Sequence, residues 1–277
     1  MDRQSALDAK ECPMKPARIT LNCIAVATIF IFYAPILMVV LTSFFTVRRG
    51  KVNWSSFSFD WYGKLLSNEG IGLAVLSSLK VGAISVAVSL GLGLLIAVYV
   101  TRQRTPRWEA GAISTLVFLP FLLPPIVTGM SLLIAMKEAG IARGTNAVIV
   151  GHVVFILAIG FRTLQARLSA LDPALVWAAR DLGAGPWHSF RSVVLPQLKL
   201  PLATSAIMSF AISFDETMIT LFLIGDGLTL PIRLYGMMRY GFTPEISALV
   251  TLVLIFTALL TALLALFTRG RTQGIAG

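Results

Sequence analysis

Charged residues are scarce in this chain. Only 13% of its 277 residues are Asp, Glu, Lys or Arg, 56% are hydrophobic, and the mean hydropathy is +0.82. Because a soluble domain is about one quarter charged, this composition excludes an ordinary soluble fold. Several stretches of about eighteen or more nearly uncharged residues are long enough to cross a bilayer as helices. We therefore expect an integral membrane protein of several helices.

Residue types that commonly perform chemistry are also scarce. The two cysteines, Cys12 and Cys23, imply no disulfide framework. The two histidines, His152 and His188, lack the ligand spacing of a metal site, so we interpret each as a packing or interfacial residue and expect no metal. No nucleophile–base pair is recognisable, and no G-x-x-x-x-G-K-S/T sequence is present to hold nucleotide phosphates. We predict that the chain is not an enzyme and carries no cofactor.

Acidic residues are outnumbered by basic ones. The chain has 23 Lys and Arg against 13 Asp and Glu, which gives a net charge of +10. In a soluble protein this balance suggests nucleic-acid binding. Here the basic residues lie mostly between apolar runs, so the surface of a lipid bilayer accounts for them and no nucleic-acid partner is expected.

Six hydrophobic runs are long enough to be membrane-spanning helices. They lack the alternation of barrel strands, so helices are the structure in which lipid-exposed backbone groups can pair internally. The expected spans are 19–46, 81–100, 110–135, 145–161, 200–224 and 246–267. The first run is longer than the core of a signal peptide, so we expect it to be retained. Pro120, Pro124 and Pro125 remove helix hydrogen bonds and are expected to kink or break the third span.

The distribution of basic residues predicts the orientation in the membrane. An even number of spans places both termini on one side, and the segments on that side contain fourteen Lys and Arg against eight in the alternate loops. The positive-inside rule then places both termini in the cytoplasm. We expect a cytoplasmic tail at 1–18, one transmembrane domain at 19–268 with a long cytoplasmic loop at about 168–199, and a cytoplasmic tail at 269–277.

A polar, glycine-containing stretch interrupts the apolar sequence within that long loop. Asp172 is a typical N-cap, Pro173 suits the first helical position, and Gly183 is a typical helix stop, so the sequence predicts a helix of about ten residues. A second short segment, PWHSFRSVVLPQLKLP, follows, and its prolines Pro196 and Pro201 flank the start of the fifth span. Such a helix–turn–helix can receive a push from a soluble partner, or it can lie on the lipid surface as an amphipathic loop.

This stretch resembles the EAA loop of permeases from ATP-binding-cassette (ABC) importers. The pattern of that loop is E-A-A, three residues, G, and then a hydrophobic residue, L and P about ten residues further on. The matching positions here are Ala178, Ala179, Gly183, Val194, Leu195 and Pro196. Trp177 replaces the acidic residue of the pattern, so the carboxylate of the pattern is absent at this position.

The resemblance covers nearly the whole chain. FDWYGKLLSN, SSLKVGAISVAVSLGLGLLIAVYVTR, FLPFLLPPIVTGMSLL, SFDET and PEISALVTLVLI are similar in order and spacing to the permeases of spermidine/putrescine-type importers, and most similar to the second of their two permease subunits. The resemblance implies an all-helical type I importer permease in a bacterial inner membrane. Its implied partners are a second permease subunit, an ABC ATPase dimer that binds ATP and Mg²⁺, and a periplasmic solute-binding protein.

By the same resemblance, the short helix is a coupling helix that docks into a groove on the ATPase subunit. The residues given this role are Trp177, Ala178, Ala179, Arg180, Asp181, Leu182, Gly183 and Ala184.

Two sets of residues are candidates for the substrate pathway. Asp215 and Glu216 are acidic residues deep in the predicted fifth span, where ionisable groups usually face a bundle interior, a cavity or a partner charge. They either line the path of a cationic solute or form a structural salt bridge or hydrogen bond. As adjacent residues of one helix they are expected to point about 100° apart.

Pro124, Pro125 and Thr128 form the second set, because a proline-broken helix can expose backbone carbonyls to a translocation path. The nearby Gly129 and Ser131 have an alternative role, because small residues permit close packing of membrane helices.

The sequence therefore predicts a permease subunit that forms half of the pathway of an ABC importer for a small organic solute, with a polyamine as the best single candidate. Another small solute is the first alternative. An ion-gradient-driven secondary transporter is the second, but it is expected to have matched broken helices in both halves, and only the first half has a strong proline break. A membrane-embedded enzyme requires a catalytic constellation that the sequence lacks.

Overall fold

The computed structural model describes residues 14–48, 51–102, 104–239, 241 and 243–272 of the chain. Five of its helices are long and apolar enough to cross a membrane, and a bent pair of shorter helices makes a sixth candidate when it counts as one span. The predicted all-helical, polytopic fold is thus confirmed. The predicted tails, 1–18 and 269–277, lie outside the described residues except where α1 and α12 extend into them. The chain divides into two compact units, Met1–Leu65 with Phe242–Leu252 and Leu66–Gly241 with Val253–Gly277.

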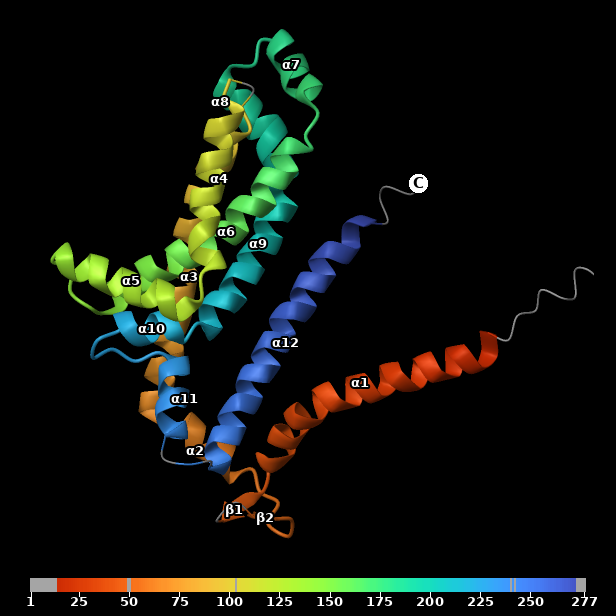
Figure 1. The fold of residues 1–277 in the computed structure, drawn as a ribbon, viewed down its shortest axis with the longest axis vertical. Helices are drawn as coiled ribbons and strands as arrows, with labels where there is room; N and C mark the ends of the chain where they lie inside the picture. The colour runs from red at the N-terminus through yellow and green to blue at the C-terminus, as the bar shows by residue number, and fades with distance from the viewer. Residues whose placement is uncertain (1–13, 49–50, 103, 240, 242, 273–277) are drawn as a thin grey trace, which may run out of the picture. The chain divides into compact units, whose positions relative to one another are not determined.

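The first unit begins with one long apolar helix. α1 (Met14–Thr42) is followed by the antiparallel strands β1 (Thr46–Arg48) and β2 (Lys51–Asn53), in which Val47 faces Val52, and by α2 (Asp60–Leu66) (Figure 1). The sequence did not predict this short hairpin. Its base is closed by the Ser56 hydroxyl, which pairs with the hydroxyl of Thr46 at 2.6 Å and accepts a hydrogen bond from the Thr46 N–H at 2.9 Å. These side-chain bonds add to the few ladder bonds that two three-residue strands can form.

The second unit is built around two long helices. α3 (Glu69–Val100) begins at the N-cap Asn68, whose side chain accepts a hydrogen bond from the Ile71 N–H, and it packs along α6 (Thr145–Ser169). The helix therefore starts well before the predicted residue 81. The core includes Val81, Val148 and Ile156, together with Ile219 and Leu223 from a later segment.

Glycines allow α3 and α6 to approach closely. A Cβ atom at Gly93 would lie 3.1 Å from the Phe161 backbone nitrogen and 3.5 Å from the Gly160 carbonyl carbon. Membrane helices gain much of their association energy from such close backbone contact.

We expect Gly93→Leu to destabilise the second unit by about 1–3 kcal/mol, the usual range for overpacking a well-filled core. The matched control is Gly91→Leu, because nothing lies within 4 Å of a Cβ atom at Gly91. Thermal unfolding in detergent measures the difference. Equal midpoints for the two variants would mean that α3 and α6 do not touch at Gly93.

The third predicted span is two helices joined by a sharp bend. α4 (Arg107–Leu122) and α5 (Pro125–Glu138) meet at an angle of 107° (Figure 1). The predicted break at the proline cluster is therefore confirmed.

The prediction for the fifth span was wrong at both ends. Instead of starting near residue 200, the helical run begins at α8 (Pro186–Ser189) and passes through a π-helical stretch, η2 (Phe190–Val194), into α9 (Leu195–Asp215). The π-helical turn ends at Val194, two residues before Pro196. This wider turn accommodates the proline, so the helical run continues through it. Instead of continuing to residue 224, the run stops at Asp215, and a separate helix, α10 (Met218–Leu223), follows.

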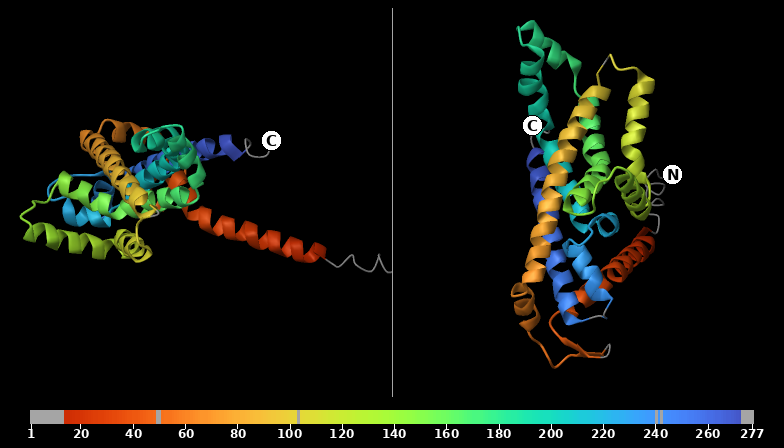
Figure 2. Two further views of the ribbon diagram at one scale, coloured as in Figure 1. Left: turned by 90° about the horizontal axis from the view of Figure 1, so that it is seen from above. Right: turned by 90° about the vertical axis from the view of Figure 1, so that its left-hand side faces the viewer.

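Three further helices complete the second unit. α7 (Pro173–Asp181) lies at the end of the unit away from α5 and α10, and α11 (Leu230–Met238) packs on α3 (Figure 2). α12 (Pro244–Thr272) begins in the first unit and continues in the second. Within the second unit, the centroid of its Phe256 ring lies 5.0 Å from that of the Phe214 ring of α9.

Candidate functional site

The predicted short helix between the fourth and fifth spans is present, with the predicted ends. The Asp172 carboxylate accepts a hydrogen bond of 2.9 Å from the Ala174 N–H, and Pro173 occupies the first helical position of α7. Gly183 has φ +86°, and Gly183 and Ala184 donate their N–H groups back to the carbonyls of Arg180 and Ala179. These two bonds form a Schellman motif, in which glycine adopts a left-handed conformation without steric cost.

α7 contacts α8 and η2, but most of its surface is exposed. No residue of α7 is buried, and all eight predicted docking residues, 177–184, are exposed or half-buried. Leu182 is 89% exposed and Trp177 is 54% exposed. Leu175, Ala178 and Leu182 follow the spacing of one helical face. A short apolar face held by capping at both ends of its helix is suited to contact a partner.

The prolines of the third span break the helix and leave one carbonyl to be satisfied. Pro124 has no N–H, so it cannot donate to the carbonyl of Pro120. The Thr128 hydroxyl instead donates to that carbonyl at 3.2 Å, and Thr128 is itself buried. The break therefore bends the chain while the Pro120 carbonyl keeps a partner.

Gly129 brings α5 against α10. A Cβ atom there would lie 2.9 Å from the Phe222 ring and 3.1 Å from the Ile219 Cα atom. The close-packing role predicted as an alternative for Gly129 thus fits the geometry. Ser131 is exposed and takes no part in this contact.

The sequence predicted that Asp215 and Glu216 are adjacent residues of one helix, and this prediction was wrong. The two residues lie at a break, because α9 ends at Asp215 and α10 begins at Met218. Glu216 has an extended conformation (φ −72°, ψ 105°), and its carboxylate accepts hydrogen bonds from the N–H groups of Met218 and Ile219 at 2.8 and 3.0 Å. These bonds cap the start of α10 and compensate for the lost helical bonds. A hydrogen-bonded structural role, which the sequence left open, therefore applies to Glu216.

The Asp215 carboxylate is exposed, and no ion pair joins either carboxylate to a basic side chain among the described residues. The structural salt bridge considered for this pair is thus not present within that part of the chain.

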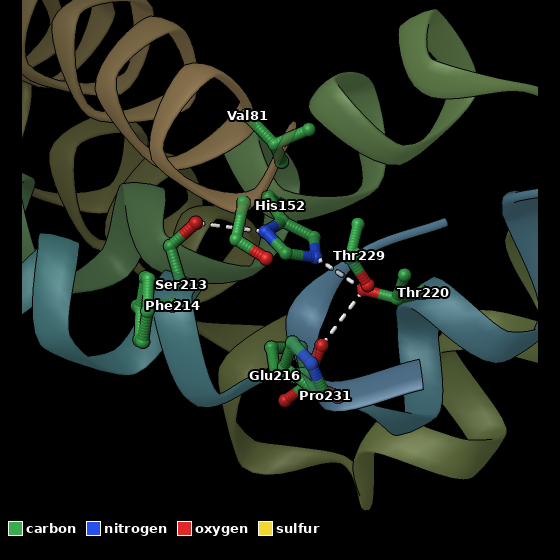
Figure 3. Close-up of a pocket in the computed structure, with 9 residues that line it drawn as sticks. Val81, His152, Ser213, Phe214, Glu216, Thr220, Thr229 and Pro231 are labelled. Atoms are coloured by element: carbon green, nitrogen blue, oxygen red, sulfur yellow. Dashed lines mark hydrogen bonds between the residues drawn. The ribbon is translucent and has the colours of Figure 1, made fainter. Parts of the chain in front are cut away.

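His152, interpreted from the sequence as a packing or interfacial residue, has a place in the site that the sequence did not predict. It is only 2% exposed, and its ring nitrogens Nδ1 and Nε2 lie 2.7 Å from Ser213 Oγ and 2.8 Å from Thr220 Oγ1 (Figure 3). Ser213 belongs to the last turn of α9 and Thr220 to the first turns of α10. His152 on α6 therefore bridges the break that carries Asp215 and Glu216.

A small pocket surrounds this bridge. Its lining combines one carboxylate, four hydroxyls and the histidine, and it contains no basic side chain other than that histidine. The lining residues are Ser78, Val81, His152, Ser213, Phe214, Glu216, Thr220, Thr229 and Pro231 (Figure 3). Among the residues that the structure describes, no group of three or more His, Cys, Asp or Glu side chains is placed to hold a metal ion. The lining residues therefore include one acidic side chain and no Lys or Arg.

One signal in the sequence pointed to this cluster. Ser205, Ser209 and Ser213 recur every four residues in an otherwise apolar helix, and all three are buried. A polar stripe at this spacing marks a helix face that packs inside a membrane bundle. The partner of the stripe, His152, is 61 residues from Ser213 in the sequence, so the pairing itself was not predictable.

Comparison with known proteins gives three consistent findings. Residues 89–273 match the family described as "Binding-protein-dependent transport system inner membrane component". The spermidine/putrescine transport system permease protein PotC of Escherichia coli (strain K12) is 30% identical over 246 residues, which cover 88% of this chain and 92% of that protein. The putrescine transport system permease protein PotI of the same strain is 33% identical over 229 residues, covering 80% and 81%.

A solved structure shares the fold. A chain of a bacterial ABC transporter involved in the import of the acidic polysaccharide alginate superposes with a TM-score of 0.71 over 94% of this chain and 97% of that chain. The sequence identity is 13%, so the likeness concerns the fold alone.

Proposed function

This chain belongs to the inner membrane components of binding-protein-dependent transport systems, and from that premise we propose that it forms half of the translocation pathway of a polyamine importer. As a member of the family it is a non-catalytic permease of an ABC importer, and ATP is hydrolysed by a separate subunit. The finer steps of the proposal concern how the chain receives that energy, what it carries and how it is oriented.

We propose that α7 is the coupling helix. The observation that carries this step is the exposed apolar face of a helix whose two ends are both fixed by hydrogen bonds. Leaving a large apolar side chain such as Leu182 in water is unfavourable, and a rigid, preorganised helix loses little entropy on docking. Residues 177–184 then dock into a groove on the ATPase subunit.

Trp177 gives this docking surface a particular chemistry. It stands where the family pattern has an acidic residue, and it is more than half exposed. An indole ring contributes apolar contact area and one N–H donor, and it lacks the negative charge that would attract a basic side chain. The groove of the partner subunit is therefore expected to be apolar or aromatic opposite Trp177.

The proposed cargo is a polyamine. Relatives about 30% identical over most of their length are named for spermidine and putrescine transport. Asp215, an exposed carboxylate with no ion pair in the described chain, supplies a negative charge that a cationic amine can contact. Glu216 stands beside it with one carboxylate oxygen committed to capping α10. The lining of the pocket at this break includes the Glu216 carboxylate and no Lys or Arg, and this charge balance supports a cation over an anion as cargo.

Pro124, Pro125 and Thr128 are proposed to shape the same pathway. They place α5 across α10 at the break after Glu216, so two interrupted helices meet near the proposed cation contact. Interrupted helices in membrane proteins are tolerated where they are buried in protein or line a cavity.

The remaining partners and the orientation follow from the same proposal. The chain works with a second permease subunit, an ABC ATPase dimer and a periplasmic solute-binding protein. Both termini and α7 face the cytoplasm, where the ATPase is located, as the excess of basic residues indicates.

Uptake into proteoliposomes tests this function. The complete complex is expected to accumulate spermidine or putrescine only when ATP, Mg²⁺ and the binding protein are present. One observation favours the alternative function of a secondary transporter: the break between α9 and α10 is a second interrupted helix, which the sequence did not reveal. Uptake by this chain alone, driven by an ion gradient, would overturn the proposal.

A further inference from the structure

His152 lies at the centre of a chain of hydrogen bonds that crosses the break between α9 and α10. Its Nδ1 is paired with the Ser213 hydroxyl on one side and its Nε2 with the Thr220 hydroxyl on the other. The Thr220 hydroxyl in turn donates to the backbone carbonyl of Glu216 at 2.7 Å. The chain therefore ends on the residue whose extended backbone forms the break.

The direction of each hydrogen bond follows from the last one. A hydroxyl has a single hydrogen, and a carbonyl oxygen can only accept, so the Thr220 hydrogen is directed to Glu216. The Thr220 oxygen must then accept from His152, which places a proton on Nε2. A buried ring whose nitrogens face hydroxyls, with no carboxylate paired to it, is favoured in the neutral form. Nδ1 is therefore the acceptor, and the Ser213 hydroxyl donates to it (Figure 3).

This arrangement fixes two helix ends that have no continuous backbone helix between them. The last turn of α9 is tied to α6 through Ser213, and the first turns of α10 are tied to α6 through Thr220. α10 is also held by the close contact of its residues Ile219 and Phe222 with Gly129 of α5. Without the bridge, α9 and α10 can rewind or separate, and the positions of Asp215 and Glu216 change with them.

We propose that His152, with its proton on Nε2, is a positioning residue that holds the break between α9 and α10 open and so places Asp215 and Glu216. The hydrogen-bond chain stands on its own geometry, whereas its effect on transport rests on the proposed function. His152 does not itself contact the cargo. It acts through Ser213 and Thr220, and the link to Thr220, which continues to the Glu216 carbonyl, accounts for most of the effect.

Variants at His152 separate this role from simple packing. The amide of Gln reaches about as far as Nε2 and keeps a donor for Thr220, whereas the amide of Asn reaches only about as far as Nδ1. We expect His152→Gln to retain most of the cargo-stimulated ATPase activity and uptake. His152→Asn is expected to lower both activities about tenfold, because it leaves the buried Thr220 hydroxyl without its hydrogen-bond donor. Equal activities for the two variants would overturn the proposal.

Smaller changes on the partner helices test the same role if a His152 variant fails to fold. Thr220→Val removes the hydroxyl that continues the chain to Glu216 and is expected to lower uptake about tenfold. Ser213→Ala removes the other hydroxyl and is expected to lower uptake by less than Thr220→Val does. Ser209→Ala is the matched control, because the Ser209 hydroxyl is buried one turn earlier on α9 and has no partner among the described residues. Wild-type uptake in Thr220→Val, with the complex assembled, would contradict the proposal.

A spectroscopic measurement tests the tautomer without any transport assay. The chain has only two histidines, so ¹⁵N-histidine labelling of this subunit in the assembled complex gives two ring systems, and His188→Gln identifies the exposed one. His152 is expected to show a protonated Nε2 and an unprotonated Nδ1 at neutral pH. A protonated Nδ1 would overturn the hydrogen-bond chain. If the complex fails to carry polyamines while this signature is present, the proposed cargo is wrong and the bridge remains.

Discussion

Leu182→Asp is expected to abolish stimulation of the partner ATPase while the chain still inserts into the membrane. Leu182 is 89% exposed at the end of α7, and in the docked complex it would be buried against the ATPase subunit. Burying an unpaired carboxylate at an interface is strongly unfavourable. Central contact residues are commonly worth about 2 kcal/mol or more, which corresponds to an affinity roughly thirtyfold weaker. Co-purification and cargo-stimulated ATP hydrolysis measure the effect.

The control for this variant is Leu66→Asp. Leu66, at the end of α2, is 85% exposed and lies outside the proposed docking surface. It therefore reports the general cost of adding a carboxylate to the surface of the chain. If Leu182→Asp and Leu66→Asp leave the same ATPase activity and the same amount of bound ATPase subunit, α7 does not dock there.

Asp215→Asn is expected to lower uptake of a cationic polyamine roughly ten- to hundredfold at subsaturating cargo, the effect of losing one charge-assisted hydrogen bond. The substitution keeps the shape of the side chain and removes its charge. No described residue relies on that carboxylate as an ion-pair partner, so the fold is expected to be unaffected. Initial rates of radiolabelled putrescine uptake measure the change.

Two further variants interpret that result. Asp226→Asn removes an exposed carboxylate from the segment after α10 and is expected to leave uptake unchanged. Glu216→Gln keeps an oxygen that can cap Met218 and Ile219, so any loss of uptake reports the charge and not the cap. Uptake of putrescine at the wild-type rate in Asp215→Asn would show that Asp215 does not contact the cargo.

Features set by local sequence were predictable. The ends of α7 depend on Asp172, Pro173 and Gly183, whose hydrogen bonds stay within a few residues of each position. The bend between α4 and α5 depends on prolines that remove a donor wherever they occur. Long spans such as α6 follow from length and hydropathy alone.

Features set by distant contacts were not predictable. The break after Asp215 interrupts an apolar run, and it is stabilised by the carboxylate of Glu216 and by His152, which belongs to a helix far away in the sequence. Pro201 lies inside α9, where the Ser205 hydroxyl donates to its carbonyl at 2.7 Å. Tertiary packing can stabilise such a proline inside a membrane helix. The prolines suggested that the fifth span starts near residue 200, whereas the helical run begins at Pro186.

The proposed coupling depends on contact between α7 and the ATPase subunit. A photo-reactive amino acid in place of Leu182, in the assembled importer reconstituted in lipid, tests this contact directly. We expect a covalent adduct with the ATPase subunit. Adducts with phospholipid alone would show that α7 lies on the membrane surface, and would contradict the proposed coupling.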